Sequence, residues 1–228
     1  LLHDVPEDTP VTLAEIEQNF GADIASMVAG ITKLGKIKYR GVERYIENLR
    51  KMFIAIAEDV RVMMIKFADR IHNLQTLEHL PPKKRYRVAL ESLEIFAPIA
   101  NRLGMGEIKG LLEDYSFKYV YPKEFEWVSK IREQKARVKE DYYNRVIARM
   151  QKELELAGIE VNEMNWRTKH LYSLYLKLLK HDKDIRQVYD IAAVRIIVDN
   201  IADCYAALGI LHKLWRPLKG RIKDYISQ

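Results

Sequence analysis

The pattern of apolar and polar residues predicts helices through the first two thirds of the chain. From Leu13 the apolar positions recur at helical spacing through Ile31, and Gly21 interrupts them. Thr12 and Glu15 have the spacing of a capping box, which predicts that a helix begins between them. Further helices are predicted over residues 43–57, 60–80, 85–101, 107–119 and 122–157, and a basic, glycine-containing stretch over residues 33–41 is predicted to be a loop.

The pattern changes near residue 159. Residues 159–166 alternate apolar and polar side chains, as a strand does, and residues 192–198 (AAVRIIV) form the β-branched, apolar run of a buried strand. Amphipathic helices are predicted over residues 169–179 and 202–215. Strands that alternate with helices indicate an α/β domain. We therefore expect two domains of different class.

Composition sets limits on the class of protein. The 228 residues are 48% hydrophobic and 31% charged, which is ordinary for a soluble protein. No apolar run approaches the roughly 18 residues of a membrane span, and a single Cys204 excludes a disulfide framework and fits a reducing cytoplasm. The net charge of +6 suits polyanionic partners such as nucleotides, but it equally suits a role in solubility alone. Because the chain opens on Leu1 rather than Met, we expect its natural N-terminus to lie upstream.

A first cluster of polar residues lies at the start of the chain. His3 and Asp4 precede Glu7 and Asp8 by four positions, and Pro6 between them predicts a helix end followed by a turn. An imidazole with carboxylates suits a divalent ion such as Mn²⁺ or Fe²⁺, which makes hydroxide available near neutral pH. A His-Asp doublet alone is more often a pair of exposed surface residues or helix-capping residues than a set of metal ligands.

A second cluster lies within the helix predicted over residues 60–80. Asp69, Asn73 and Thr76 occupy positions i, i+4 and i+7, so they share one helix face. His72 is expected to form a hydrogen bond within the helix packing. The apolar stripe of this helix is predicted at Val62, Ile65, Ala68 and Leu80, near that face but not on it.

These segments together resemble the hydrolase domain of the Rel/Spo family, which makes and destroys the nucleotide (p)ppGpp. The resemblance is carried by His3-Asp4-x-x-Glu7-Asp8, Gly30-Ile31-Thr32-Lys33-Leu34, Glu47-Asn48-Leu49-Arg50-Lys51-Met52, Ile65-Lys66-Phe67-Ala68-Asp69-Arg70-Ile71-His72-Asn73 and Ala97-Pro98-Ile99-Ala100-Asn101-Arg102-Leu103-Gly104. It implies a mainly α chain, with an all-helical HD-type phosphohydrolase domain over residues 1–104, a helical connector over 105–158 and part of an α/β, nucleotidyltransferase-like synthetase domain over 159–228.

The resemblance also implies roles for single residues of the hydrolase. The metal ligands, for Mn²⁺, are His3, Asp4 and Asp69; Glu7 and Asp8 orient or activate the attacking water; and Asn73 and Thr76 contact the nucleoside. The family has one more histidine ligand upstream of this motif. We therefore expect a weakened metal site in this chain, and a parent protein that hydrolyses the 3′-diphosphate of (p)ppGpp.

The second half resembles the family's synthetase, which transfers pyrophosphate from ATP to GDP or GTP. The matching residues are Arg167-x-Lys169-His170-x-Tyr172-Ser173-x-x-x-Lys177, Tyr189-Asp190-Ile191-x-Ala193-x-Arg195, Cys204-Tyr205-x-x-Leu208-Gly209, His212-x-x-Trp215 and Arg221-x-Lys223-Asp224-Tyr225. The resemblance assigns ATP contacts to Arg167, Lys169, Ser173 and Lys177, the Mg²⁺ position to Asp190 and a further phosphate contact to Arg195. Cations of this kind are what a triphosphate requires. Without the resemblance, residues 169–180 would be taken for an ordinary amphipathic helix.

The resemblance has further implications for activity and partners. The basic version of Arg221-x-Lys223-Asp224 accompanies bifunctional members of the family. The guanine-binding loop and the catalytic glutamate lie beyond Gln228, so we expect no synthesis by this chain. Guanine nucleotides (GDP, GTP, ppGpp and pppGpp) and ATP are the expected partners, with no membrane and no direct DNA binding. Ribosome contacts are expected only through C-terminal domains outside this sequence.

Two other functions stay open at this point. A non-catalytic module that binds guanine nucleotides would need the same basic and polar residues but no complete metal site. An HD phosphohydrolase for another nucleotide would share the first half, although the synthetase-like second half argues against it.

Overall fold

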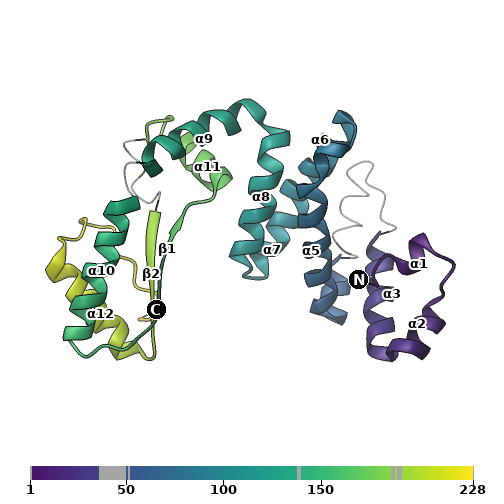
Figure 1. Ribbon diagram of the computed structural model, residues 1–228, viewed down its shortest axis with the longest axis horizontal. Helices are drawn as coiled ribbons and strands as arrows, with labels where there is room; N and C mark the ends of the chain where they lie inside the picture. The colour runs from purple at the N-terminus through teal and green to yellow at the C-terminus, as the bar shows by residue number, and fades with distance from the viewer. Residues whose placement is uncertain are drawn as a thin grey trace. The chain divides into compact units, whose positions relative to one another are not determined.

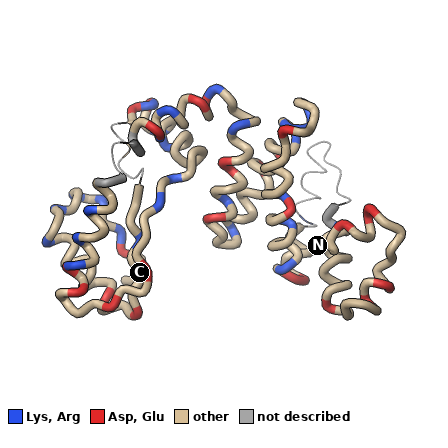
Figure 2. The backbone as a smooth tube through the Cα atoms, viewed as in Figure 1, with Lys and Arg blue, Asp and Glu red and all other residues tan. Residues whose placement is uncertain are grey.

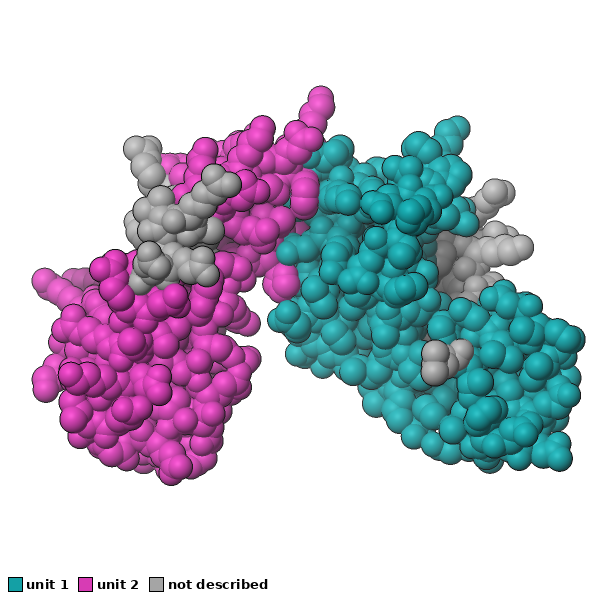
Figure 3. Space-filling model, viewed as in Figure 1, with its two compact units in different colours: residues 1–122 teal, residues 123–228 magenta. Residues whose placement is uncertain are grey.

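The computed structural model of the chain is mainly helical with one small sheet, as the sequence predicts (Figure 1). It describes residues 2–35, 50, 52–137, 140–185, 188 and 192–227. The chain divides into two compact units, Leu1–Pro122 and Lys123–Gln228 (Figure 3). Positions occupied by Lys or Arg and by Asp or Glu are interspersed along the helices of each unit (Figure 2). Within the described residues, no helix is both long enough and apolar enough to cross a membrane.

The first unit consists of helices. They are α1 (Val5–Asp8), α2 (Leu13–Phe20), α3 (Ala22–Gly35), α5 (Val60–Gln75), the 3₁₀ turn η1 (Leu77–His79), α6 (Pro82–Glu91), the π-helical segment η2 (Ser92–Phe96), α7 (Ala97–Arg102) and α8 (Gly106–Val120). The helices predicted over residues 60–80, 85–101 and 107–119 are confirmed. The loop predicted over residues 33–41 is wrong at Lys33 and Gly35, which belong to α3; residues 36–41 lie outside the described part of the chain. Of the helix predicted over residues 43–57, residues 52–57 are described and helical.

The start of α2 follows from its capping residues. The Thr12 hydroxyl accepts a hydrogen bond from the Glu15 amide at 3.3 Å, and the Glu15 carboxylate accepts one from the Thr12 amide at 2.7 Å. The hydrogen bonds that the Glu15 carboxylate accepts from the Thr12 amide and the Thr12 hydroxyl lower the pKa of Glu15 below its ordinary value. Gly21 ends the helix with a φ of 89°, a conformation that costs glycine little. The predicted capping box and the predicted break are both confirmed.

Helix α5 lies at the centre of the first unit. It packs against α3 on one side and α8 on the other. Its buried side chains are Val62, Met63, Phe67 and Leu74. The predicted stripe is therefore wrong at Ala68, which is exposed. Phe67, the preceding residue, is fully buried instead. Its ring meets that of Phe96 edge to face, with ring centroids 6.5 Å apart.

Helices α6, η2 and α7 form one continuous helical run whose middle is widened. Pro98 has no amide hydrogen, and its ring would clash with the carbonyl of Glu94 in a regular α-helix. The π-helical segment Ser92–Phe96 immediately precedes it and relieves that conflict locally. The Ser92 hydroxyl donates to the Val88 carbonyl at 2.7 Å, so this buried polar group is satisfied.

Gly30 allows α3 and α5 to approach closely. A Cβ at this position would lie 2.9 Å from Cγ2 of Val62, a stiff β-branched side chain. We predict that Gly30→Ala destabilises the protein by about 1–2 kcal/mol, because overpacking of about 1–3 kcal/mol exceeds the helix-propensity gain of about 1 kcal/mol. The measurement is urea unfolding followed by far-UV circular dichroism. Gly209→Ala is the matched control, since a Cβ there meets nothing within 4 Å. The control should be neutral or slightly stabilising; equal losses in both variants would contradict the packing argument.

The second unit carries the sheet. Its elements are α9 (Pro122–Arg137), α10 (Glu140–Leu156), β1 (Val161–Thr168), α11 (Leu171–Lys180), β2 (Ala192–Val198) and α12 (Ile201–Leu214). The strands are antiparallel, with Trp166 opposite Val194 and Asn165 opposite Arg195. One sheet face packs on a core centred on Leu154, Ile159 and Ala207. The strands and helices predicted after residue 159 are confirmed. The prediction that residues 192–198 form a buried strand is wrong, because half-buried and exposed residues alternate along β2.

Helix α8 belongs with the first unit by its contacts. It packs against α5, α6, α7 and η2, and its Tyr115 hydroxyl accepts a hydrogen bond from Gln75 of α5 at 3.0 Å. The division into residues 1–104, 105–158 and 159–228 stays a prediction. By its contacts, the segment from residue 105 to Pro122 belongs to the first unit.

Candidate active site

Helix α5 carries a largely buried carboxylate that is surrounded by polar groups. Asp69 is only 14% exposed. One of its oxygens accepts a hydrogen bond from Asn73 at 2.8 Å, and the other accepts one from the Lys66 ammonium at 2.9 Å. Positions 66, 69 and 73 are three and four apart, so one helix face assembles the whole group.

These contacts keep Asp69 ionised. Burial raises the pKa of its carboxyl, but the hydrogen bond and charge of Lys66, with smaller effects from His3 and Arg70, outweigh burial and hold the pKa below its ordinary value. Asp69 is therefore a carboxylate at neutral pH, the form that binds a metal ion.

The start of the chain brings His3 to this carboxylate. The Nε2 atom of His3 lies 3.0 Å from an Asp4 oxygen and 3.8 Å from an Asp69 oxygen. Asp4 is the N-cap residue of α1, yet its side chain does not cap that helix. The helix end and turn predicted here are wrong, because a helix begins at Val5; Pro6 fits its first turn, where no amide hydrogen is needed.

The donor atoms suit a divalent ion. Among the described residues, the buried Nε2 atom of His3 forms no hydrogen bond, although an Asp4 oxygen lies 3.0 Å away, and this is unfavourable unless another group occupies its lone pair. An imidazole nitrogen and two carboxylates are ligands of the borderline divalent ions. Among the residues that the structure describes, however, no three His, Cys, Asp or Glu side chains stand assembled as a metal cluster. The structure thus brings His3 to both carboxylates without completing a coordination shell.

The other residues predicted for hydrolysis, Glu7, Asp8, Asn73 and Thr76, are all exposed. Glu7 and Asp8 are exposed in the first turn of α1. Thr76 is the C-cap residue of α5, and its hydroxyl donates to the His72 carbonyl at 3.2 Å. The side chain of His72 is exposed, so the expected role in helix packing is wrong.

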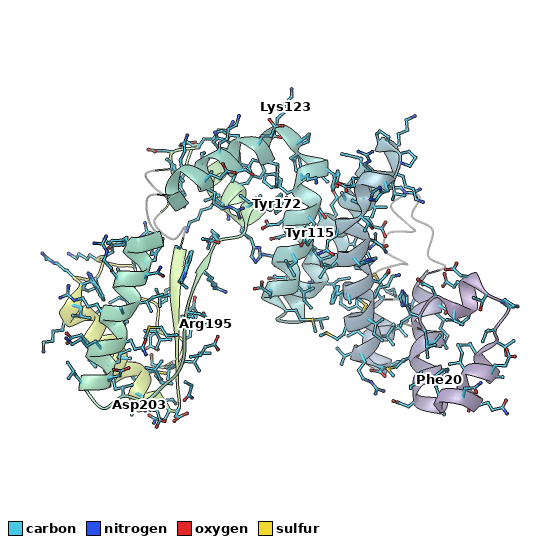
Figure 4. All side chains as sticks on the ribbon, viewed as in Figure 1. Phe20, Tyr115, Lys123, Tyr172, Arg195 and Asp203 are labelled. Atoms are coloured by element: carbon cyan, nitrogen blue, oxygen red, sulfur yellow. The ribbon has the colours of Figure 1, made fainter. Side chains whose placement is uncertain are left out.

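A cavity of about 460 Å³ adjoins His3 within the first unit. Its walls are mostly apolar and come from the segment before α1 and from α2, α3 and α5: Leu2, His3, Phe20, Ile24, Met27, Val28, Ile31 and Ile65. Phe20, at the end of α2, is half exposed (Figure 4). An apolar cavity can accept the face of a ring or an aliphatic chain, but it does not supply the cations that bind phosphate.

The second unit brings two predicted synthetase residues to one face. Arg167 of β1 and Arg195 of β2 are exposed, and the register places them at diagonal positions on the same side of the sheet. Arg195 also forms an ion pair with Glu163 at 3.4 Å. Ser173 and Lys177 share one face of α11 and are half buried, as is Lys169 just before it. Asp190, the predicted Mg²⁺ position, lies outside the described residues.

Sequence reasoning overlooked two residues that shape the first site. Lys66 neutralises Asp69, and its place three positions before Asp69 is the signal that could have revealed it. Arg70 forms an ion pair with Glu91 of α6 at 3.0 Å and stacks on Phe96 at 4.2 Å. No local pattern connects Arg70 with residues more than 20 positions away.

Comparisons with known proteins match both units. A family model described as an HD domain matches residues 1–106, and one described as a region found in RelA / SpoT proteins matches residues 166–228. The whole chain is 46% identical to a guanosine-3′,5′-bis(diphosphate) 3′-pyrophosphohydrolase of Aquifex aeolicus and 44% identical to one of Haemophilus influenzae. It is 41% identical to the bifunctional (p)ppGpp synthase/hydrolase SpoT of Escherichia coli. The chain spans about a third of the length of these relatives: 32%, 34% and 32%.

Proposed function

Since the chain belongs to the RelA/SpoT family, we propose that its first unit hydrolyses the 3′-diphosphate of (p)ppGpp to give GDP or GTP and pyrophosphate. The observation that carries the proposal is the approach of His3 Nε2 to the carboxylates of Asp4 and Asp69, within 3.0 and 3.8 Å. An HD domain implies dependence on a divalent metal ion. These three residues are the ones proposed to hold it, and Mn²⁺ is the proposed ion.

Each residue of the site has a proposed task. When bound, the ion lowers the pKa of a coordinated water and offsets phosphate charge. Asp69 is held ionised and in place by Lys66 and Asn73. Glu7 and Asp8, exposed beside the site, orient the attacking water and accept its proton. Asn73 and Thr76 contact the nucleoside.

The second unit is proposed to be part of a synthetase that transfers pyrophosphate from ATP to GDP or GTP. Arg167 and Arg195 lie on one sheet face and offer two guanidinium groups to a triphosphate. Lys169, Ser173 and Lys177 follow on α11 and just before it, and Asp190 is proposed to hold Mg²⁺. Contacts with the ribosome and a cytoplasmic location also belong to this proposal for the whole protein.

A second function has one observation in its favour. The described residues contain no assembled metal cluster. A module that binds guanine nucleotides without turnover would have no need of one. Turnover separates the two functions directly.

The test is release of pyrophosphate from ppGpp, with ATP and GTP as alternative substrates and with Mn²⁺, Mg²⁺ or a chelator added. It should be run on this chain and on a longer protein that contains it, because the relatives are about three times as long. We expect Mn²⁺-dependent release from ppGpp alone, at least in the longer protein. Saturable ppGpp binding without any release in either protein would support the non-catalytic module instead.

A further inference from the structure

A second pocket lies wholly within the second unit, and none of the residues assigned above to hydrolysis or to ATP lines it, although Trp166 directly precedes Arg167. Its volume is about 170 Å³. Helix α10, both strands and the residue that ends α12 supply its walls: Tyr142, Tyr143, Val146, Trp166, Ala192, Ala193, Val194 and Trp215. Four of these eight residues are aromatic, in a chain whose aromatic fraction is 10%.

The aromatic rings are arranged as a partly exposed platform. Tyr143 stacks on Trp166, with centroids 5.5 Å apart and planes 20° from parallel. Tyr142 meets Tyr143 edge to face at 5.8 Å. Tyr142 is 50% exposed and Trp166 is 36% exposed, so the rings are not fully covered by the protein's own packing. Exposed rings held in fixed planes are suited to stack another flat ring.

A positive charge stands beside this platform. Tyr142, Val146 and Arg149 occupy positions i, i+4 and i+7 of α10, so they share one helix face. The Arg149 guanidinium lies 5.8 Å from the ring centroid of Trp215, which is itself part of the pocket wall. A ligand seated on the rings would therefore have a guanidinium within reach, and a guanidinium favours phosphate.

We propose that this pocket binds a nucleotide outside both catalytic sites, with its base on the aromatic platform and its phosphate toward Arg149. The volume fits one planar ring system, since an engineered apolar cavity of about 150 Å³ holds benzene. Neither feature alone selects a nucleotide: the rings accept any flat group, and the arginine accepts any anion. Together they select a flat ring that carries an anionic group.

Intrinsic fluorescence provides the test. The chain has three tryptophans, and two of them, Trp166 and Trp215, line the pocket. In a Trp127→Phe background, both emitting residues therefore report on it. The 228-residue chain carrying this substitution is titrated with GMP, AMP, guanosine and ribose 5-phosphate. We expect saturable quenching by the nucleotides, binding of guanosine weakened about 10-fold by loss of the phosphate, and no quenching by ribose 5-phosphate.

Variants distinguish this pocket from the proposed catalytic sites. Trp166→Leu and Arg149→Gln should each weaken nucleotide binding about 10-fold or more, as loss of one stacking or one charged contact does. Lys169→Ala, in the proposed ATP site, should leave the quenching unchanged, and all three proteins should retain the far-UV circular dichroism of the parent. Absence of quenching up to millimolar GMP and AMP would overturn the proposal. So would quenching that survives both pocket variants but is lost in Lys169→Ala. Neither result bears on hydrolysis at His3, Asp4 and Asp69.

Discussion

Asp69→Ala should reduce release of pyrophosphate from ppGpp by at least about 10²-fold. Loss of a residue that merely orients a metal ligand costs about 10–100-fold, so loss of a proposed ligand should cost at least the upper end of that range. Asp69 is the carboxylate of α5 that faces His3, and its removal also leaves the Lys66 ammonium without its partner at 2.9 Å. A positive charge would then stand where the ion is proposed to bind, which opposes metal binding further.

The measurement combines turnover with metal binding. Pyrophosphate release is followed at saturating Mn²⁺, and Mn²⁺ affinity is measured by calorimetry without nucleotide. Glu78→Ala is the control, because Glu78 is an exposed carboxylate that follows α5 in η1. The control should keep full activity and full Mn²⁺ affinity. If Asp69→Ala binds Mn²⁺ as tightly as the parent and keeps more than a tenth of its activity, Asp69 is not a ligand and the proposed site is wrong.

Local sequence signals were sufficient for most of the secondary structure. Thr12 and Glu15 predicted the start of α2, and the run AAVRIIV predicted β2 with the bounds that the structure shows, Ala192–Val198. These features depend on neighbours within a few positions, which a sequence displays directly. Asp69 and Asn73, predicted to share a helix face, also form a hydrogen bond for the same reason.

The predictions are wrong or incomplete where contacts between residues far apart in the sequence determine the structure. Pro6 predicts a helix end by its local preference, but the first turn of a helix also accepts proline, and only the following residues show which case applies. The sequence pattern predicts Ala68 rather than Phe67 in the apolar stripe of α5, because the buried face depends on which helices pack against it. The approach of His3 to Asp69 joins residues 66 positions apart, so only the resemblance, and no spacing rule, could connect them before the fold was known.

Arg70→Met should destabilise the first unit by about 3–5 kcal/mol, the cost of leaving one partner of a buried ion pair without the other. The side chains of Arg70 and Glu91 are 12% and 10% exposed, and their atoms lie 3.0 Å apart. The guanidinium also covers the Phe96 ring at 4.2 Å, where η2 widens the helical run. Within the described residues its buried Nε has no hydrogen-bond partner, so the pair is not fully satisfied even when intact.

A second substitution shows whether the charge or the packing matters. Replacing both partners, Arg70→Met with Glu91→Leu, removes the stranded carboxylate and should recover most of the lost stability, since apolar replacements of buried ion pairs are often neutral or stabilising. All three tryptophans lie in the second unit. Unfolding in urea is therefore followed by far-UV circular dichroism for the helices of both units and by tryptophan emission for the second unit alone.

Comparing circular dichroism with tryptophan emission shows which unit loses stability. Arg70→Met should shift the circular-dichroism transition to lower urea while the emission midpoint moves much less, and the double variant should restore the first signal. A double variant as unstable as Arg70→Met would mean that stacking of Arg70 on Phe96, rather than charge pairing, holds α5 against α6 and η2. In that case the guanidinium acts mainly by its flat surface. Arg70→Lys, which keeps the charge but loses the plane, should then be as damaging as Arg70→Met.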